Sequence, residues 1–128
     1  MTDGVRTGIR LLLVEDDEPL AGLLSAHLRA RGYAVTVAPT AEAAQIALEE
    51  DVRPDLLVLD INLPGETGWS VLRSDAFAAA GRPPVIVTSA MSVSPTRLRE
   101  FAVAGYVPKP FALDTLRSTI ERLLVTTT

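Results

Sequence analysis

Short apolar runs alternate along the chain with segments in which apolar residues recur every three or four positions. The apolar runs occupy residues 9–14, 33–37, 56–59, 85–88 and 106–107. Consecutive apolar residues are typical of a strand that is buried on both faces, whereas a period of 3.6 residues is typical of an amphipathic helix. The pattern therefore predicts five strands, each followed by a helix.

The predicted helices have recognisable start and stop signals. Asp17 is placed to cap the first helix, Thr40 the second, and Ser94, followed by Pro95, the fourth. Gly32 and Gly81 end the first and third helices. The predicted inner faces are Leu20, Leu23, Leu24 and Leu28; Ala43, Ala44, Ala47 and Leu48; Trp69, Val71, Leu72, Ala76 and Phe77; Leu98, Phe101 and Ala102; and Leu113, Leu116, Ile120 and Leu123. His27 lies on or beside the apolar face of the first helix, and we assign it a structural role only.

Five strands that alternate with five helices predict an α/β protein with a doubly wound parallel sheet. The chain has 128 residues, which is enough for one domain and too few for two. We expect a flexible N-terminal tail over residues 1–8, one domain over residues 9–124 and a C-terminal tail over residues 125–128.

Composition narrows the classes of function. The chain has 16 acidic and 12 basic side chains, a formal net charge of −4 and no cysteine. The absence of cysteine excludes disulfides and a thiolate zinc site, and the acidic balance argues against direct binding to nucleic acid or to an anionic membrane. No apolar run approaches the roughly 18 residues of a membrane span, and the N-terminus lacks the hydrophobic core of a signal peptide. We therefore expect a cytoplasmic protein with no membrane partner.

Polar residues gather where the predicted strands end. Glu15 and Asp16 follow the first strand, Asp60 the third and Ser89 the fourth, while Lys109, the only lysine in the chain, follows the fifth. In open parallel α/β sheets, ligands bind beyond the carboxyl ends of the strands, where the strand order reverses. We therefore expect these side chains to meet at one site.

Three carboxylates that meet in this way require a compensating cation. Two like charges at 4 Å repel by about 4 kcal/mol at an effective dielectric constant near 20. Oxygen ligands without histidine or cysteine indicate Mg²⁺, with Mn²⁺ in its place as the alternative, rather than zinc. Lys109 and Ser89 suit phosphate oxygens, and with no histidine or cysteine at a strand end Asp60 is the candidate nucleophile.

These residues and their order resemble the response-regulator receiver domain of bacterial two-component signalling, a CheY-like family. The resemblance runs from about residue 9 to residue 124 and rests on residues 11–17, 55–64 with Gly68, 84–90 and 105–111. It implies the flavodoxin-like strand order 2-1-3-4-5. It also implies roles for individual residues: Glu15, Asp16, Asp60 and the backbone carbonyl of Asn62 as Mg²⁺ ligands, Asp60 as phosphoacceptor, Lys109 and Ser89 as phosphoryl contacts, Ser89 and Tyr106 as switch residues, and Lys109-Pro110 as a cis peptide bond.

The resemblance implies a phosphorylated switch and not an enzyme that acts on a separate substrate. Asp60 would accept a phosphoryl group from a sensor histidine kinase or a histidine phosphotransfer protein. The face made by the fourth helix, fifth strand and fifth helix would then bind a downstream protein. Thr88 is the rival of Ser89, but the count from Pro84 to Ala90 favours Ser89.

Two alternative functions remain open at this point. A Mg²⁺-dependent aspartyl-phosphate phosphohydrolase of the haloacid-dehalogenase type also uses a strand-end aspartate, but it needs a second acid two residues later, where this chain has Asn62. An interaction module that keeps the fold without being phosphorylated would have no need of the acidic pair, Asp60 and Lys109. The stretch from Ser89 to Lys109 is about two residues shorter than is usual in the family, which leaves the outline of the fourth helix open.

Overall fold

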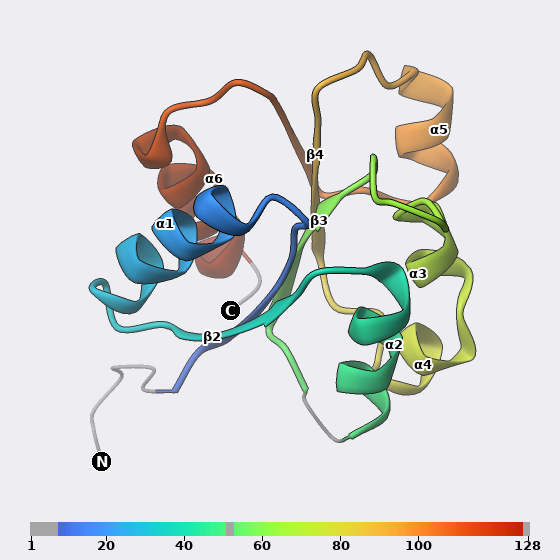
Figure 1. The fold of residues 1–128 in the computed structure, drawn as a ribbon, viewed down its shortest axis with the longest axis horizontal. Helices are drawn as coiled ribbons and strands as arrows, with labels where there is room; N and C mark the ends of the chain where they lie inside the picture. Colours follow the sequence, from blue (N-terminus) through green and yellow to red (C-terminus); the bar gives the residue numbers. More distant parts are fainter. Residues whose placement is uncertain (1–7, 51–52, 127–128) are drawn as a thin grey trace.

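The computed structural model describes residues 8–50 and 53–126, and its core is one parallel sheet (Figure 1). The strands are β1 (Arg10–Val14), β2 (Ala34–Ala38), β3 (Leu56–Asp60), β4 (Val85–Ser89) and β5 (Gly105–Pro108). All neighbouring pairs are parallel, and the order across the sheet is β2-β1-β3-β4-β5. The predicted α/β class, doubly wound topology and strand order are confirmed.

The described residues form six helices, whereas the sequence pattern predicted five. They are α1 (Glu18–Arg29), α2 (Ala41–Glu49), α3 (Trp69–Arg73), α4 (Asp75–Ala79), α5 (Pro95–Glu100) and α6 (Leu113–Thr126). The predicted third helix is divided at Ser74, whose backbone is extended at φ −76° and ψ 154°. The Ser74 hydroxyl donates to the carbonyl of Val71 at 2.6 Å and accepts from the N–H of Phe77 at 3.1 Å. Because one side chain caps α4 and bonds the last turn of α3, two short helices replace a continuous one.

The predicted caps of the other helices are present. Asp17, Thr40 and Ser94 each accept a hydrogen bond from the N–H three residues later, at 3.0–3.1 Å. Leu23 was wrongly placed on an inner face: it is 56% exposed, because it lies on the side of α1 turned away from the buried stripe of Ala21, Leu24 and Leu28.

The last helix extends past residue 124, where the domain was predicted to end. The last helix, α6, continues to Thr126, two residues into the C-terminal tail that was predicted from residue 125. Its last turn carries the buried Leu124, whose packing holds this end of the helix to the domain. The predicted N-terminal tail, apart from Gly8, and residues 127 and 128 lie outside the described residues.

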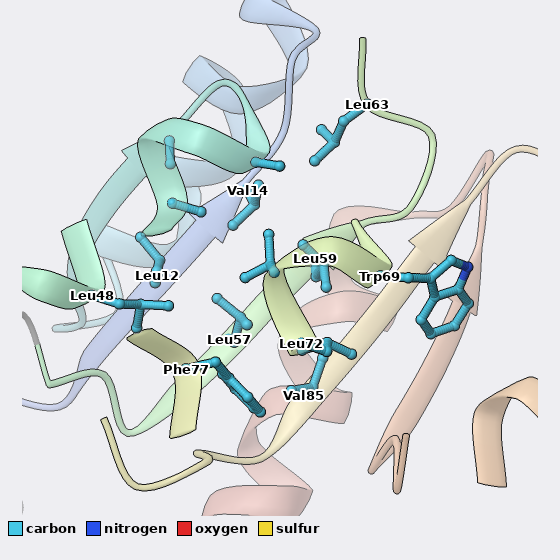
Figure 2. Packing of buried hydrophobic residues seen from close by; sticks show 14 of the residues in the cluster. Leu12, Val14, Leu48, Leu57, Leu59, Leu63, Trp69, Leu72, Phe77 and Val85 are labelled. Atoms are coloured by element: carbon cyan, nitrogen blue, oxygen red, sulfur yellow. The ribbon is translucent and has the colours of Figure 1, made fainter. Parts of the chain in front are cut away.

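Helices cover both faces of the sheet (Figure 1). On one face, α1 and α6 pack on a cluster that contains Leu11, Leu13, Val58 and Ile86. On the other, α2, α3 and α4 pack on Leu12, Val14, Leu57 and Leu59, with Trp69, Leu72 and Phe77 facing the strands (Figure 2). Successive strand residues thus enter different clusters, which explains why β1 and β3 are apolar at consecutive positions.

None of the helices in the described ranges combines the length and the hydrophobicity that a membrane crossing requires.

Candidate functional site

Three carboxylates converge at the carboxyl ends of β1 and β3. The two strands are hydrogen-bonded neighbours, so Glu15 and Asp16, which follow β1, come beside Asp60, the last residue of β3. One carboxylate oxygen from each of the three residues lies within 4.8 Å of the other two. Glu15 and Asp60 are each only 3% exposed, whereas Asp16 faces solvent. The convergence predicted from the strand ends is therefore present.

Lys109 reaches the same cluster from the end of β5. Its Nζ lies 2.8 Å from Glu15 Oε1 and 3.1 Å from Asp60 Oδ2, and its backbone N–H donates to the carbonyl of Ser89 at 2.8 Å. The Lys109-Pro110 peptide bond is cis, as the resemblance implied. The ion pair with Glu15 was not predicted, although a buried glutamate in a chain with one lysine is a signal for it.

Burial and charge shape the protonation of this cluster. Burial raises the pKa of Glu15, and the nearby charge of Asp60 raises it further, against the opposing hydrogen bonds from Lys109 and the N–H of Asp17. Burial acts to lower the pKa of Lys109, but the combined hydrogen bonds and charges of Glu15 and Asp60 outweigh it and raise the pKa. Lysine therefore stays charged between the two buried acids.

The donor set of the cluster fits a small divalent cation. With all three acids ionised, Lys109 leaves an excess of two negative charges among the clustered groups. The donors are carboxylate oxygens, and such hard ligands suit Mg²⁺ or Mn²⁺.

Asn62 and Ser89 meet beside Asp60. The backbone N–H of Asn62 donates to Asp60 Oδ1 at 2.9 Å, and the Ser89 hydroxyl donates to Asn62 Oδ1 at 2.6 Å. Ser89 Oγ in turn accepts from the N–H of Met91 at 3.0 Å, and the Tyr106 hydroxyl donates to the carbonyl of Met91 at 3.4 Å. The sequence had pointed to the backbone carbonyl of Asn62, and the contact of its side chain with Ser89 was missed.

Hydrogen bonding distinguishes Ser89 from its rival Thr88. Both residues are buried, so exposure does not separate them. The Ser89 side chain is the one bonded to Asn62. Ser89 is thus the β4 hydroxyl placed at the site.

Gly68 allows the loop after β3 to fold back onto the site. Its N–H donates to the carbonyl of Ile61 at 3.0 Å. A Cβ at this position would lie 2.6 Å from the carbonyl oxygen of Asp60 and 3.0 Å from the Cα of Ile61. Because both obstacles are backbone atoms, only glycine fits, and α3 begins directly against the Asp60 loop.

The fold and the site define a class of protein: a doubly wound α/β domain with an acid cluster and one lysine at the switch point of its sheet. The model of the response regulator receiver domain family matches residues 11–121. The chain belongs to this family, whose members are the receiver domains of two-component regulatory systems.

Relatives and solved structures agree with this membership. The chain is 35% identical over 117 residues to the uncharacterized transcriptional regulatory protein YvcP of Bacillus subtilis, covering 90% of this chain and 48% of YvcP. It therefore spans about half the length of that relative.

Among solved structures, a CheY-like receiver domain from Methanospirillum hungatei superimposes with a TM-score of 0.84 at 23% identity, covering 94% of this chain and 96% of that one. The response regulator TrrA of Thermotoga maritima, solved in complex with Mg²⁺-BeF, has a TM-score of 0.76 at 29% identity, covering 89% and 97%. The first of these likenesses concerns the fold alone.

Proposed function

We propose that this receiver domain accepts a phosphoryl group on Asp60 from the phosphohistidine of a sensor histidine kinase or of a histidine phosphotransfer protein. The observation that carries the proposal is the contact of Lys109 with both Asp60 and Glu15, at 3.1 and 2.8 Å, inside a cluster of three acids. An ammonium group at this position can stabilise the negative charge of a phosphoryl group that arrives at Asp60. A purely structural pair would not require the third carboxylate, Asp16.

Each group has a defined part in the transfer. An oxygen of Asp60 forms a bond to phosphorus as the P–N bond of phosphohistidine breaks, and the bonding electron pair leaves with the imidazole nitrogen. The Lys109 ammonium, already beside Asp60, stabilises the negative charge of the incoming phosphoryl oxygens. The N–H of Asn62 orients Asp60 through the bond to Oδ1. The transfer thus depends on positioning and charge.

A divalent cation would complete this arrangement. Glu15, Asp16, Asp60 and the carbonyl of Asn62 would hold Mg²⁺, with Mn²⁺ as a substitute. When bound at these residues, the ion would supply positive charge that offsets the carboxylates and the incoming phosphoryl group. The excess of two negative charges in the cluster supports this part of the proposal.

Phosphorylation would be read at the opposite end of the site. The new phosphoryl oxygens attract the Ser89 hydroxyl and Lys109, and Tyr106 turns inward into the space that Ser89 leaves. The surface formed by α5, β5 and α6 then changes its affinity for a downstream protein, as a shift between two populations. The chain performs its own phosphorylation and dephosphorylation and turns over no separate substrate.

Mass spectrometry of the phosphorylated peptide tests the acceptor directly. Incubation with acetyl phosphate and Mg²⁺ should add one phosphoryl group to the peptide containing Asp60, and Asp60→Asn should abolish it. Asp75→Asn is the matched control, because Asp75 is an exposed acid in the first turn of α4, outside the acid cluster. Labelling that persists in Asp60→Asn would refute the assignment, and steady release of phosphate from small phosphate esters would favour a phosphohydrolase instead.

A further inference from the structure

A chain of hydrogen bonds connects the phosphoacceptor loop to the aromatic switch position, and the side chain of Asn62 is one of its members. Asn62 Oδ1 accepts a hydrogen bond from the Ser89 hydroxyl, and Ser89 Oγ accepts one from the N–H of Met91. The carbonyl of Met91 accepts a hydrogen bond from the Tyr106 hydroxyl. At the other end, the backbone of Asn62 is bonded to Asp60. The hydrogen-bonded path from Asp60 to Tyr106 therefore runs through Asn62, Ser89 and Met91.

The Ser89 hydroxyl has a single proton to donate. A serine hydroxyl offers one O–H donor, and here it is directed at Asn62 Oδ1 across 2.6 Å, near the short end of the range for such bonds. The same hydroxyl cannot at the same time donate to a phosphoryl group on Asp60. Asn62 and the phosphoryl group are therefore competing acceptors for the one hydrogen bond that the Ser89 hydroxyl can donate.

Burial makes this competition decisive. Ser89 is 1% exposed, so its hydroxyl has little access to bulk water when it leaves Asn62. Asn62 is exposed, and its side chain can be solvated when the bond is broken. Breaking the hydrogen bond between Ser89 and Asn62 is favourable only when another acceptor at the site accepts a hydrogen bond from the Ser89 hydroxyl.

We propose that the Asn62 side chain is a positioning residue, which holds Ser89 in the unphosphorylated arrangement through a bond that we call the Asn62–Ser89 latch. This inference rests on the proposed function. The latch favours the off state, because activation must break it along with the contact between Ser89 and Met91. The free energy of the Asn62–Ser89 hydrogen bond is thus one part of the free-energy difference between the off and on states, which phosphorylation must overcome.

The experiment uses beryllofluoride with Mg²⁺ as the phosphoryl mimic, and measures the bound fraction by ¹⁹F NMR. Asn62→Ala removes the acceptor and keeps the backbone carbonyl. We expect the apparent affinity for beryllofluoride to increase about threefold to tenfold, the range for loss of one net hydrogen bond. Ser92→Ala is the matched control, because Ser92 is an exposed serine of the same loop outside the bond chain, and it should leave the affinity unchanged.

A double-mutant cycle separates the latch from a general effect of Asn62. In a Ser89→Ala background no latch exists, so Asn62→Ala should no longer increase the affinity. An unchanged or weakened affinity in Asn62→Ala alone would overturn the latch, as would an equal gain in the Ser89→Ala background. Failure of the unmodified chain to bind beryllofluoride at all would instead refute the proposed function, and the latch with it.

Discussion

Replacing Asp16 by asparagine should stabilise the metal-free protein while removing its response to Mg²⁺. The carboxylate oxygens of Asp16, Glu15 and Asp60 lie within 4.8 Å of one another, and at that separation two unit charges repel by about 1 kcal/mol even in bulk water. The bulk-water value applies because Asp16 is exposed. Asp16 faces two such partners, and its attraction to Lys109 offsets part of the repulsion. We expect a net gain of about 1 kcal/mol in the free energy of unfolding.

Thermal unfolding in EDTA and in saturating Mg²⁺ measures both effects. In EDTA, Asp16→Asn should raise Tm by about 3–5 °C for a domain of this size. In Mg²⁺ the unmodified chain should gain stability by mass action, because the ion binds only the folded state, and the variant should gain little or none. Asp16→Asn should therefore be more stable than the unmodified chain in EDTA and less stable than it in Mg²⁺.

Asp17→Asn is the control for this experiment. The Asp17 side chain caps α1 by accepting the N–H of Leu20 at 3.1 Å, and asparagine caps as well as aspartate. It should leave both Tm values nearly unchanged. A lower Tm for Asp16→Asn in EDTA, or a full Mg²⁺ response in that variant, would show that the three acids are not held as a repelling cluster.

Three further predictions concern the stability of the site. Lys109→Met leaves Glu15 and Asp60 buried without their cation and should cost about 3 kcal/mol in urea unfolding at neutral pH, whereas an unaltered urea midpoint would contradict the ion pairs. Because burial raises the pKa of Glu15, the contribution of this residue to the stability of the metal-free protein should be fully present below the ordinary value of 4.5 and be lost as the pH rises through the raised pKa. Glu15→Gln should flatten that part of the Tm-versus-pH curve, and an equally steep curve in the variant would count against the raised pKa. Gly68→Ala places a Cβ 2.6 Å from the Asp60 carbonyl and should destabilise by about 2–3 kcal/mol, whereas Gly22→Ala, with open space around its Cβ, should not destabilise.

The fold was largely predictable because local patterns and the tertiary structure agree. The consecutive apolar residues of β1 and β3 are those whose side chains enter the two clusters on opposite faces of the sheet. The helix caps at Asp17, Thr40 and Ser94 are local interactions that depend on residues only three apart. Ser74 is the informative failure. The apolar period continues across Ser74, so the pattern predicted one helix. The Ser74 hydroxyl instead bonds the backbone on both sides, to Val71 and Phe77, and the predicted helix is divided into α3 and α4.

The convergence at the site was predictable for the same kind of reason. Residues that end neighbouring parallel strands meet at one edge of a sheet, so Glu15, Asp16, Asp60 and Ser89 could be assigned to a common site from their positions alone. Lys109 stood out because it is the only lysine. Roles in phosphoryl transfer and switching came from the resemblance to receiver domains, and they remain predictions.

The sequence alone determined which residues end the strands, because the pattern of apolar positions sets where each strand begins and ends, and the resemblance to receiver domains supplied the strand order. Only the tertiary structure decided how those residues pair. Lys109 lies closer to Glu15 than to Asp60, and the Ser89 hydroxyl is directed at the side chain of Asn62. Such choices among several partners depend on differences of a few tenths of an ångström and on burial. These quantities exist only once segments distant in the sequence have packed together.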